Sequence, residues 1–382
     1  MAKVRKRTWK NKAGEQTAWI ADYFAPGKNG KPERHIKTFA TKKEASAYLV
    51  TAQGEVQRGV HTPESTSITL AEAARLWLDR GELEKLERST LRQYRNHVDL
   101  HIVPLIGVQK LARLSTPAIE AYRDELLKKG CSRAMARKVL ASLKSILGEA
   151  QRRGLVAQNA AQPVKVDVKK REQGKLAVGR DIPSKEEISK ILAQAEGRWR
   201  PFFVTAIFTG MRASELRGLT WDDVDFERNV IHVRQRANLW GEIGAPKSAA
   251  GERAIPMAPM AVNALKEWKL VCPRKEGRLS LVFPNGSGNV ENHANIANRG
   301  FYALQTVAGI VAGDGGPKYG LHALRHFFAS WAIVREFSPK RLQALLGHSS
   351  IQMTFDRYGH LFPSLENDHA KFAAGELALV GG

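Results

Sequence analysis

Side chains that could bind a phosphate ester and attack it follow one another through the second half of the chain. In chain order these residues are Arg212, His322, Arg325, His348 and Tyr358. Guanidinium groups hold phosphate oxygens in a fixed planar geometry, histidine side chains transfer protons, and a tyrosine hydroxyl is a nucleophile. A phenol also leaves more readily than an alkoxide, so an ester formed by Tyr358 can be reversed. These residue types therefore suit reversible transfer of a phosphodiester.

Each residue taken alone also has an ordinary structural interpretation. An arginine and a glutamate three positions apart, such as Arg212 and Glu215, often form a salt bridge, and the Gly-His pair at 347–348 is typical of a helix C-terminus. His322 and His326 have the spacing of metal ligands on a helix, but no acidic residue lies between them and no cysteine lies near. The sequence therefore predicts no metal, and without a Gly-x-x-x-x-Gly-Lys-[Ser/Thr] loop it predicts no nucleotide cofactor.

Order and spacing together are more specific, and they resemble the tyrosine recombinases, the phage-integrase family of site-specific DNA strand exchangers. The family pattern is Arg, Lys, His-x-x-Arg, His or Trp, and Tyr, with an acidic residue three positions after the first Arg. Residues 183–362 fill every position of that pattern. The resemblance implies that Tyr358 attacks a DNA strand and forms a 3′-phosphotyrosyl intermediate. It implies that Lys247, between two predicted strands, protonates the departing 5′ oxygen.

The resemblance also implies roles for the other residues. Arg212 and Arg325 would hold the non-bridging phosphate oxygens, with His348 as a third donor. His322 would assist proton transfer at the tyrosine, and Glu215 would orient the arginines and histidines.

The elements that must position these residues are predicted in a mixed, mainly helical (α+β) catalytic domain, residues 183–382. A capping box at Ser184 and Glu187 opens its first helix. Helices are expected at 184–196, 201–209, 259–269, 292–308, 321–334 and 338–346. Short strands are expected at 230–233 and 253–257, and 281–283 could add a third. The tail, residues 364–382, could dock on a neighbouring protomer, as in the family, or pack on its own domain.

Two further domains are predicted before the catalytic domain. Residues 1–60 read as a small three-stranded sheet (Val4–Trp9, Thr17–Phe24 and Arg34–Phe39) followed by a helix that opens at a Thr41/Glu44 capping box and stops at Gly59. Residues 64–162 read as an all-α bundle of four helices, and 163–182 as a basic linker. The first resembles the arm-type DNA-binding domain of phage and genomic-island integrases, and the second resembles the family's core-binding domain.

Charge supports a nucleic-acid partner. The 382 residues include 60 Lys and Arg against 38 Asp and Glu, for a net charge of +22. Net charges are +8 for residues 1–60, +6 for 64–162, +3 for 163–182 and +5 for 183–382, so every segment could follow a DNA backbone. The basic residues of the bundle expected on exposed helix faces, where they could contact phosphates, are Arg92, Arg95, Lys128, Lys129, Arg133, Arg137, Lys138 and Lys144.

Two distant cysteines, Cys131 and Cys272, give no disulfide framework, and no apolar run is long enough to span a membrane. These observations predict a cytoplasmic protein, and the family resemblance implies that it associates with the nucleoid of a bacterial cell.

The family resemblance therefore predicts a recombinase that acts on double-stranded DNA attachment sites as a homotetramer and integrates or excises a mobile element. DNA-bending and excisionase proteins are candidate accessory partners. Two alternatives remain open: DNA relaxation of the type IB topoisomerase kind, which shares the chemistry, and a non-catalytic DNA-binding regulator on the same scaffold. Comparing a supercoil-relaxation assay with a two-site recombination assay would distinguish a topoisomerase from a recombinase. Covalent trapping on nicked DNA would distinguish an enzyme from a non-catalytic regulator.

Overall fold

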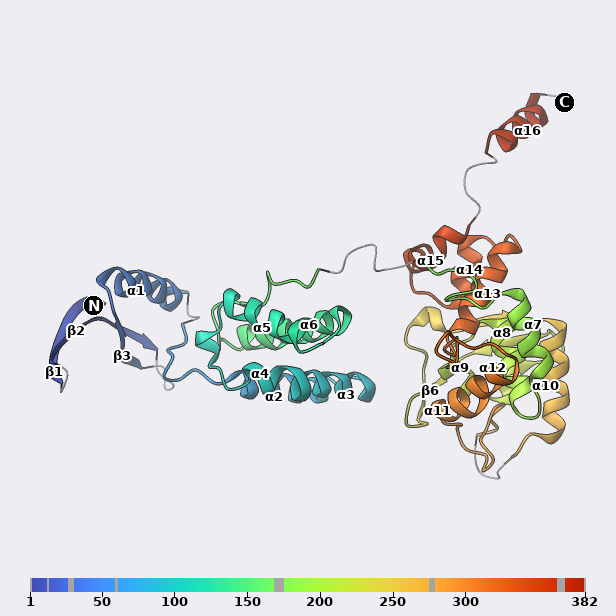
Figure 1. Ribbon diagram of the computed structural model, residues 1–382, viewed down its shortest axis with the longest axis horizontal. Helices are drawn as coiled ribbons and strands as arrows, with labels where there is room; N and C mark the ends of the chain where they lie inside the picture. The colour runs from blue at the N-terminus through green and yellow to red at the C-terminus, as the bar shows by residue number, and fades with distance from the viewer. Residues whose placement is uncertain are drawn as a thin grey trace. The chain divides into compact units, whose positions relative to one another are not determined.

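The computed structural model describes residues 2–11, 14–26, 31–58, 61–167, 175–274, 279–362 and 368–380. The chain divides into two compact units, Met1–Gln173 and Gly174–Gly382 (Figure 1). The predicted helix stop at Gly59, the middle of the predicted basic linker (168–174) and the start of the tail (363–367) lie outside the described residues.

The first unit begins with an antiparallel sheet in which the second strand is central. Its elements are β1 (Lys3–Asn11), β2 (Gly14–Pro26), β3 (Pro32–Phe39) and the helix α1 (Lys42–Gln57). The predicted capping box is present: Thr41 accepts from the backbone of Glu44, whose carboxylate accepts from the backbone of Thr41. Ala21 and Tyr23 alternate along one face of β2 and pack with Leu49 of α1. Figure 1 shows α1 lying beside the sheet.

The rest of the first unit is helical, as predicted. Its helices are α2 (Leu70–Leu83), α3 (Arg88–His97), α4 (Val103–Ile106), α5 (Thr116–Lys128) and α6 (Arg133–Arg152), with a π-helical turn, Val98–Ile102, joining α3 to α4. The inner face of α6 is buried at helical spacing and forms the centre of the bundle core. Sheet and bundle share one unit, in which Lys37 of β3 pairs with Glu64 (3.1 Å).

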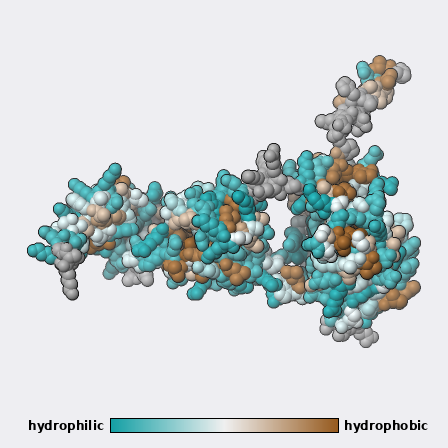
Figure 2. Space-filling model, viewed as in Figure 1, coloured by the Kyte–Doolittle hydropathy of each residue, from teal (hydrophilic) through white to brown (hydrophobic). Residues whose placement is uncertain are grey.

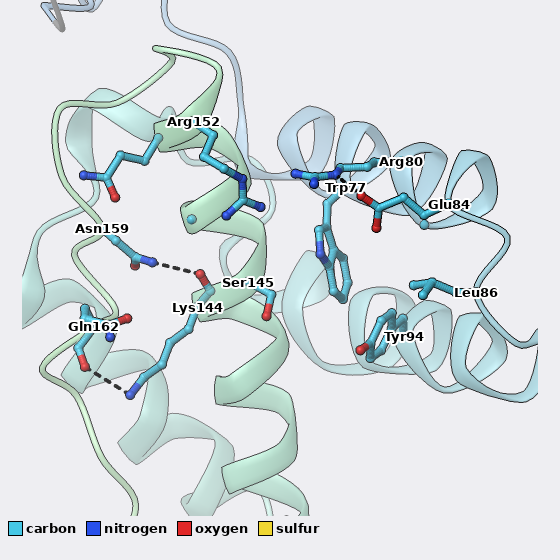
Figure 3. A pocket seen from close by; sticks show the side chains of 13 residues that line it. Trp77, Arg80, Glu84, Leu86, Tyr94, Lys144, Ser145, Arg152, Asn159 and Gln162 are labelled. Carbon is cyan, nitrogen blue, oxygen red and sulfur yellow. Dashed lines mark hydrogen bonds and ion pairs between the residues drawn. The ribbon is translucent and has the colours of Figure 1, made fainter. Parts of the chain in front are cut away.

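A pocket of about 630 Å³ lies between α2, α3 and α6 (Figure 3). Trp77 of α2 stacks on Tyr94 of α3 with ring centroids 4.5 Å apart. Lys144 of α6 donates to the backbone oxygen of Gln162 (3.1 Å) at the other side. The pocket therefore has two aromatic side chains on one side and a lysine on the other.

The second unit is mainly helical. Its helices are α7 (Lys185–Gln194), α8 (Trp199–Thr209), α9 (Ala213–Gly218), α10 (Pro259–Val271), α11 (His293–Asn295), α12 (Ala303–Val307), α13 (Ala323–Val334), α14 (Pro339–Leu346), α15 (Ile351–Tyr358) and α16 (Asp368–Val380). The Ser184/Glu187 capping box opens α7 as predicted. α8 is apolar on all sides because it runs through the core, where Phe202 and Phe203 are fully buried and α10 and α13 pack against it.

A small antiparallel sheet of order β4-β5-β8 lies in the second unit. Its strands are β4 (Val224–Asp225), β5 (Val230–Val233) and β8 (Arg253–Pro256). The connection from β5 to β8 contains a two-stranded hairpin, β6 (Arg236–Ala237) and β7 (Ile243–Gly244), and Lys247 follows β7.

The suggested third strand at 281–283 is wrong. Leu281 makes only an isolated bridge with Thr220, and the strand that completes the sheet is β4. The apolar run is explained by core packing, because residues 281–283 are all buried. Among the described helices, none has both the length and the apolar character needed to cross a membrane.

Candidate active site

A tight turn after α8 sets the position of Arg212. The helix ends at Gly210, whose φ of 61° is in the left-handed region, and a Cβ there would lie 2.4 Å from the ring of Phe328. Glycine is therefore required by both conformation and space. Two residues later Arg212 caps the N-terminus of α9, and the Gly210 carbonyl accepts a hydrogen bond from Arg325 Nη1 (2.7 Å). The turn thus brings together two of the predicted phosphate-binding arginines.

The C-terminus of α14 holds three guanidinium groups. Its last carbonyls have no partner within the helix and carry partial negative charge. In chain order Leu345 accepts from Arg253 Nε (2.6 Å), Leu346 from Arg325 Nη2 (2.5 Å) and Gly347 from Arg212 Nη2 (3.1 Å). Gly347 ends the helix with φ of 63°. One helix end therefore fixes three cations that would otherwise repel one another.

Glu215 neutralises two of these cations. Its carboxylate is buried and accepts from Arg212 Nη1 (2.7 Å) and Arg253 Nη2 (2.8 Å). Burial opposes ionisation, but the hydrogen bond and charge of Arg253, with the backbone bond and charge of Arg212, outweigh it and lower the pKa of Glu215. Arg253 is a residue that the sequence analysis missed.

Tyr358, the last residue of α15, is buried at 1% exposure. Its hydroxyl lies 2.8 Å from Nδ1 of His326. Burial raises the pKa of Tyr358 to about 12, against the opposing charges of Arg325, Arg357 and Arg212. The phenol is therefore protonated at neutral pH and hydrogen-bonded to a histidine. From sequence alone, His326 stands out only through its metal-ligand spacing with His322.

His348 lies on the other side of the tyrosine. Its ring is parallel to that of Tyr358, with centroids 6.4 Å apart, and its Nδ1 is 2.9 Å from the hydroxyl of Thr354. Desolvation, with the charges of Arg325 and Arg212, lowers the pKa of His348 to about 4, so the ring is neutral. Because Thr354 occupies Nδ1, Nε2 is the ring atom that could bond a phosphate.

His322 stands at the N-cap of α13, where it is more exposed than the other members. Its ring meets that of His326 edge-on, with centroids 4.7 Å apart. Desolvation of the ring, followed by the charges of Arg325 and Arg357, lowers the pKa of His322 to about 4. His326 therefore lies between His322 and the tyrosine hydroxyl.

Lys247 is exposed on the loop that follows β7. Within the described residues, it has no recorded hydrogen bond or ion pair with the other predicted residues. The segment that follows it does reach the site, because a Cβ on Gly347 would lie 2.9 Å from the carbonyl oxygen of Ala250. The structure thus brings six of the seven predicted residues together and leaves the lysine on a neighbouring loop.

The assembled group is called here the arginine–histidine cluster. Its members are Arg212, Glu215, Arg253, His322, Arg325, His326, His348 and Tyr358. Burial and the charge of Arg212 lower the pKa of the Arg325 guanidinium. An anion bound in the cluster would raise this pKa again. Fixed cations beside a protonated phenol and neutral imidazoles can bind a phosphodiester and exchange protons with it.

Comparisons with known proteins show which proteins this chain is similar to. Residues 184–364 match the model of the phage integrase family. A "Tyrosine recombinase XerC-like" protein of Caldanaerobacter subterraneus subsp. tengcongensis is 26% identical over 387 aligned residues, covering 94% of this chain and 96% of the relative. Prophage integrase IntR of Escherichia coli is 23% identical and covers 76% of each chain.

Solved structures show the same fold. The Tn1549 transposon integrase in complex with a circular intermediate DNA matches with a TM-score of 0.66 at 21% identity, over 81% of this chain and all of that one. A lambda integrase tetramer bound to a Holliday junction matches with a TM-score of 0.61 at 18% identity, over 93% of this chain and 94% of that one. Residues 184–364 therefore belong to the phage integrase family, and the chain is similar to tyrosine recombinases over most of its length.

Proposed function

We propose that the protein is a site-specific DNA recombinase, an integrase that cuts and rejoins DNA strands through a 3′-phosphotyrosyl intermediate and so integrates and excises a mobile element. The observation that carries the proposal is the buried hydroxyl of Tyr358, which is hydrogen-bonded to His326 in a cluster whose guanidinium groups are fixed by backbone carbonyls. The family relationship supports recombination over both topoisomerase-like relaxation and a purely regulatory role.

The cluster suggests a role for each residue in strand cleavage. Arg212 and Arg325 bind the non-bridging oxygens of the scissile phosphate, and His348 donates a further hydrogen bond through Nε2. The Tyr358 oxygen attacks phosphorus and remains bound to the 3′ end. Glu215 accepts a hydrogen bond from Arg212 and so fixes the position of its guanidinium group.

Completion of the cleavage step requires a proton for the departing 5′ oxygen. Lys247 is the proposed donor, and its exposed loop next to the end of α14 would have to close on bound DNA. The 5′-hydroxyl of a partner strand then attacks the phosphotyrosine, and the phenol leaves. One phosphodiester replaces another, so bond energy is conserved and no high-energy cofactor is needed.

The first unit is proposed to grip DNA on both sides of the exchange point, with the sheet on arm-type sites and the bundle on core sites. Exposed cations on the bundle support this role. Those for which the structure records no ion pair among the described residues include Arg92, Lys128, Arg137 and Lys138. Each phosphate neutralised would release counterions and make binding depend on salt.

A homotetramer on two DNA sites is the proposed active assembly, because exchange requires two duplexes with two cleavage sites each. The apolar side chains of α16 are exposed, and Figure 2 shows hydrophobic surface on this helix. They support docking on a neighbouring copy. DNA-bending and excisionase proteins are proposed accessory partners, and the bacterial nucleoid is the proposed location, since the substrate is chromosomal DNA.

Trapping on a suicide substrate tests the proposal. The substrate is a duplex nicked near the exchange point, built on a repeat found in the DNA that flanks the gene. Wild-type protein is expected to form a covalent complex, and Tyr358→Phe is expected to bind the DNA without forming it. Tyr319→Phe is the matched control, because Tyr319 is also buried but donates to Glu187 (2.7 Å) outside the cluster. A normal covalent complex from Tyr358→Phe would refute the assignment.

A further inference from the structure

We propose that His326 is a catalytic residue that accepts the phenolic proton of Tyr358 during strand cleavage and returns it during rejoining. The proposal rests on the proposed function and adds a residue to it. The position was expected to belong to His322, which the sequence analysis assigned to proton transfer at the tyrosine. The structure instead places another histidine against the reacting oxygen.

The three histidines of the cluster differ in their contacts with Tyr358. The ring of His322 contacts that of His326 edge-on, with centroids 4.7 Å apart. His326 Nδ1 lies 2.8 Å from the Tyr358 hydroxyl, within the range for direct proton transfer. His348 has its Nδ1 on Thr354 and presents a parallel ring 6.4 Å from the tyrosine ring. Among the described residues, His326 is thus the one for which a hydrogen bond to the tyrosine hydroxyl is recorded.

The surroundings of His326 keep its ring neutral and able to accept. Desolvation and the facing groups His322, Arg357 and Arg325 lower the pKa of His326 to about 4, while Asp181 opposes them. A neutral ring that accepts at Nδ1 carries its hydrogen on Nε2. Binding of an anionic phosphate among these cations would raise the basicity of the ring at the moment when the proton must move.

The proton balance of cleavage follows from these positions. The O–H bond of Tyr358 breaks as its oxygen bonds to phosphorus, and the proton moves to Nδ1 of His326. The bond from phosphorus to the 5′ oxygen breaks, and that oxygen takes a separate proton from the acid proposed above, Lys247. In rejoining, the attacking 5′-hydroxyl gives its proton back to Lys247, and the leaving phenolate recovers its own proton from Nδ1 of His326. Each step conserves atoms and charge without a further reactant.

Two DNA substrates distinguish the proposed base, His326, from the proposed acid, Lys247. The ordinary suicide substrate requires both proton transfers. A second substrate with sulfur in place of the scissile 5′ bridging oxygen has a leaving group that needs no proton. Loss of the acid is therefore rescued by sulfur, whereas loss of the base is not.

The test variant is His326→Asn in the full-length protein. The asparagine amide reaches the position of Nδ1 and can accept a hydrogen bond, but it cannot take a proton at neutral pH. His326→Ala is the second variant, and His232→Asn is the matched control, because His232 lies on β5 opposite Ala254 and has no recorded hydrogen bond or ring contact with the cluster among the described residues. Thermal melting and DNA binding show whether each variant is folded.

We expect His326→Asn to slow covalent-complex formation by about 10²- to 10⁴-fold on both substrates, the usual contribution of a general base. Lys247→Ala should be slow on the ordinary substrate and restored by sulfur, and His232→Asn should match wild type on both. Wild-type rates in folded His326→Asn, or restoration of that variant by sulfur, would overturn the proposal. Faster trapping by His326→Ala would also overturn it, because His326 would then only hold the tyrosine away from DNA. If wild-type protein fails to trap DNA, the proposed function fails as well.

Discussion

Glu215 and Arg253 form a buried ion pair whose partners depend on each other. Their side chains are only 3% and 6% exposed. Removing one member of a buried pair costs up to about 3–5 kcal/mol. Without Arg253 the buried Glu215 carboxylate would lose two of its hydrogen bonds and keep those from Arg212. We therefore expect Arg253→Met to lower the melting temperature of the second unit by on the order of 10 °C, given roughly 2–4 °C per kcal/mol for a unit of this size. Calorimetry of the full chain would measure the shift.

A surface arginine gives the control for this prediction. Arg228 is 83% exposed and lies 4.0 Å from Asp225, so Arg228→Met should change stability by less than about 1 kcal/mol. In the double variant Arg253→Met/Glu215→Met no buried charge of the pair remains, and the loss should be smaller than the sum of the single losses. Equal melting of Arg253→Met and Arg228→Met would contradict the argument.

Six of the seven residues predicted for the site lie together in the structure. They could be selected from sequence because arginine and histidine are costly to bury and because their order and spacing match the family pattern. Arg253 and His326 were missed because each stands inside an ordinary predicted element, and only tertiary contacts show that Arg253 meets Glu215 and that His326 meets Tyr358. Lys247 was predicted on a connecting loop and is found on one, but its catalytic position stays a prediction.

Local chemistry also predicted the elements whose ends carry strong signals. Capping boxes predicted the starts of α1 and α7, because they satisfy free backbone N–H groups with side chains only three residues away. The run 281–283 could not be assigned in the same way, since a short apolar run reads alike in a strand and in a buried connection. The convergence of three arginines on the end of α14 likewise depends on contacts between distant segments.

Within the bundle, one carboxylate joins two helices. Glu149 of α6 accepts from Arg80 of α2 and from its neighbours Arg152 and Arg153 (2.7 Å each), and Figure 3 shows Arg80 and Arg152 coming from the two helices. Desolvation opposes ionisation, but the bonds from Arg153, Arg152 and Arg80 outweigh it and lower the pKa of Glu149 to about 2.

The lowered pKa of Glu149 predicts a pH dependence. Because the folded pKa lies below the ordinary value of 4.5, the ionised carboxylate stabilises the bundle above pH 4.5 and loses this effect as the pH falls towards 2. Glu149→Gln should therefore cost about 1–3 kcal/mol at pH 7 and much less at pH 2.5. Urea unfolding at both pH values measures the difference, with Glu120→Gln on the exposed face of α5 as the control. An equal loss at both pH values would show that the charge does not contribute.

At the scale of the whole molecule, net charge and catalytic residues identify different things. The net charge of +22 is spread over both units, which indicates a long polyanionic partner and leaves the reaction unspecified. The reaction is indicated by the arginine–histidine cluster, where the cations are immobilised by carbonyls and one carboxylate. Substitutions that weaken DNA binding should therefore differ from those that slow strand cleavage. Assembly of several protein copies on DNA can be separated from cleavage in the same way.

The exposed apolar side chains of α16 predict a role in assembly and none in cleavage. Phe372 and Leu379 stand seven positions apart, on one helical face, at 76% and 87% exposure. Phe372→Glu/Leu379→Glu should leave covalent trapping on a single site unchanged and weaken tetramer formation on paired sites by about tenfold or more, a loss of at least about 1.4 kcal/mol. Analytical ultracentrifugation of the DNA complexes measures assembly, with Leu270→Glu, 87% exposed on α10, as the control. If the double variant assembles as wild type does, α16 does not dock on a neighbouring copy.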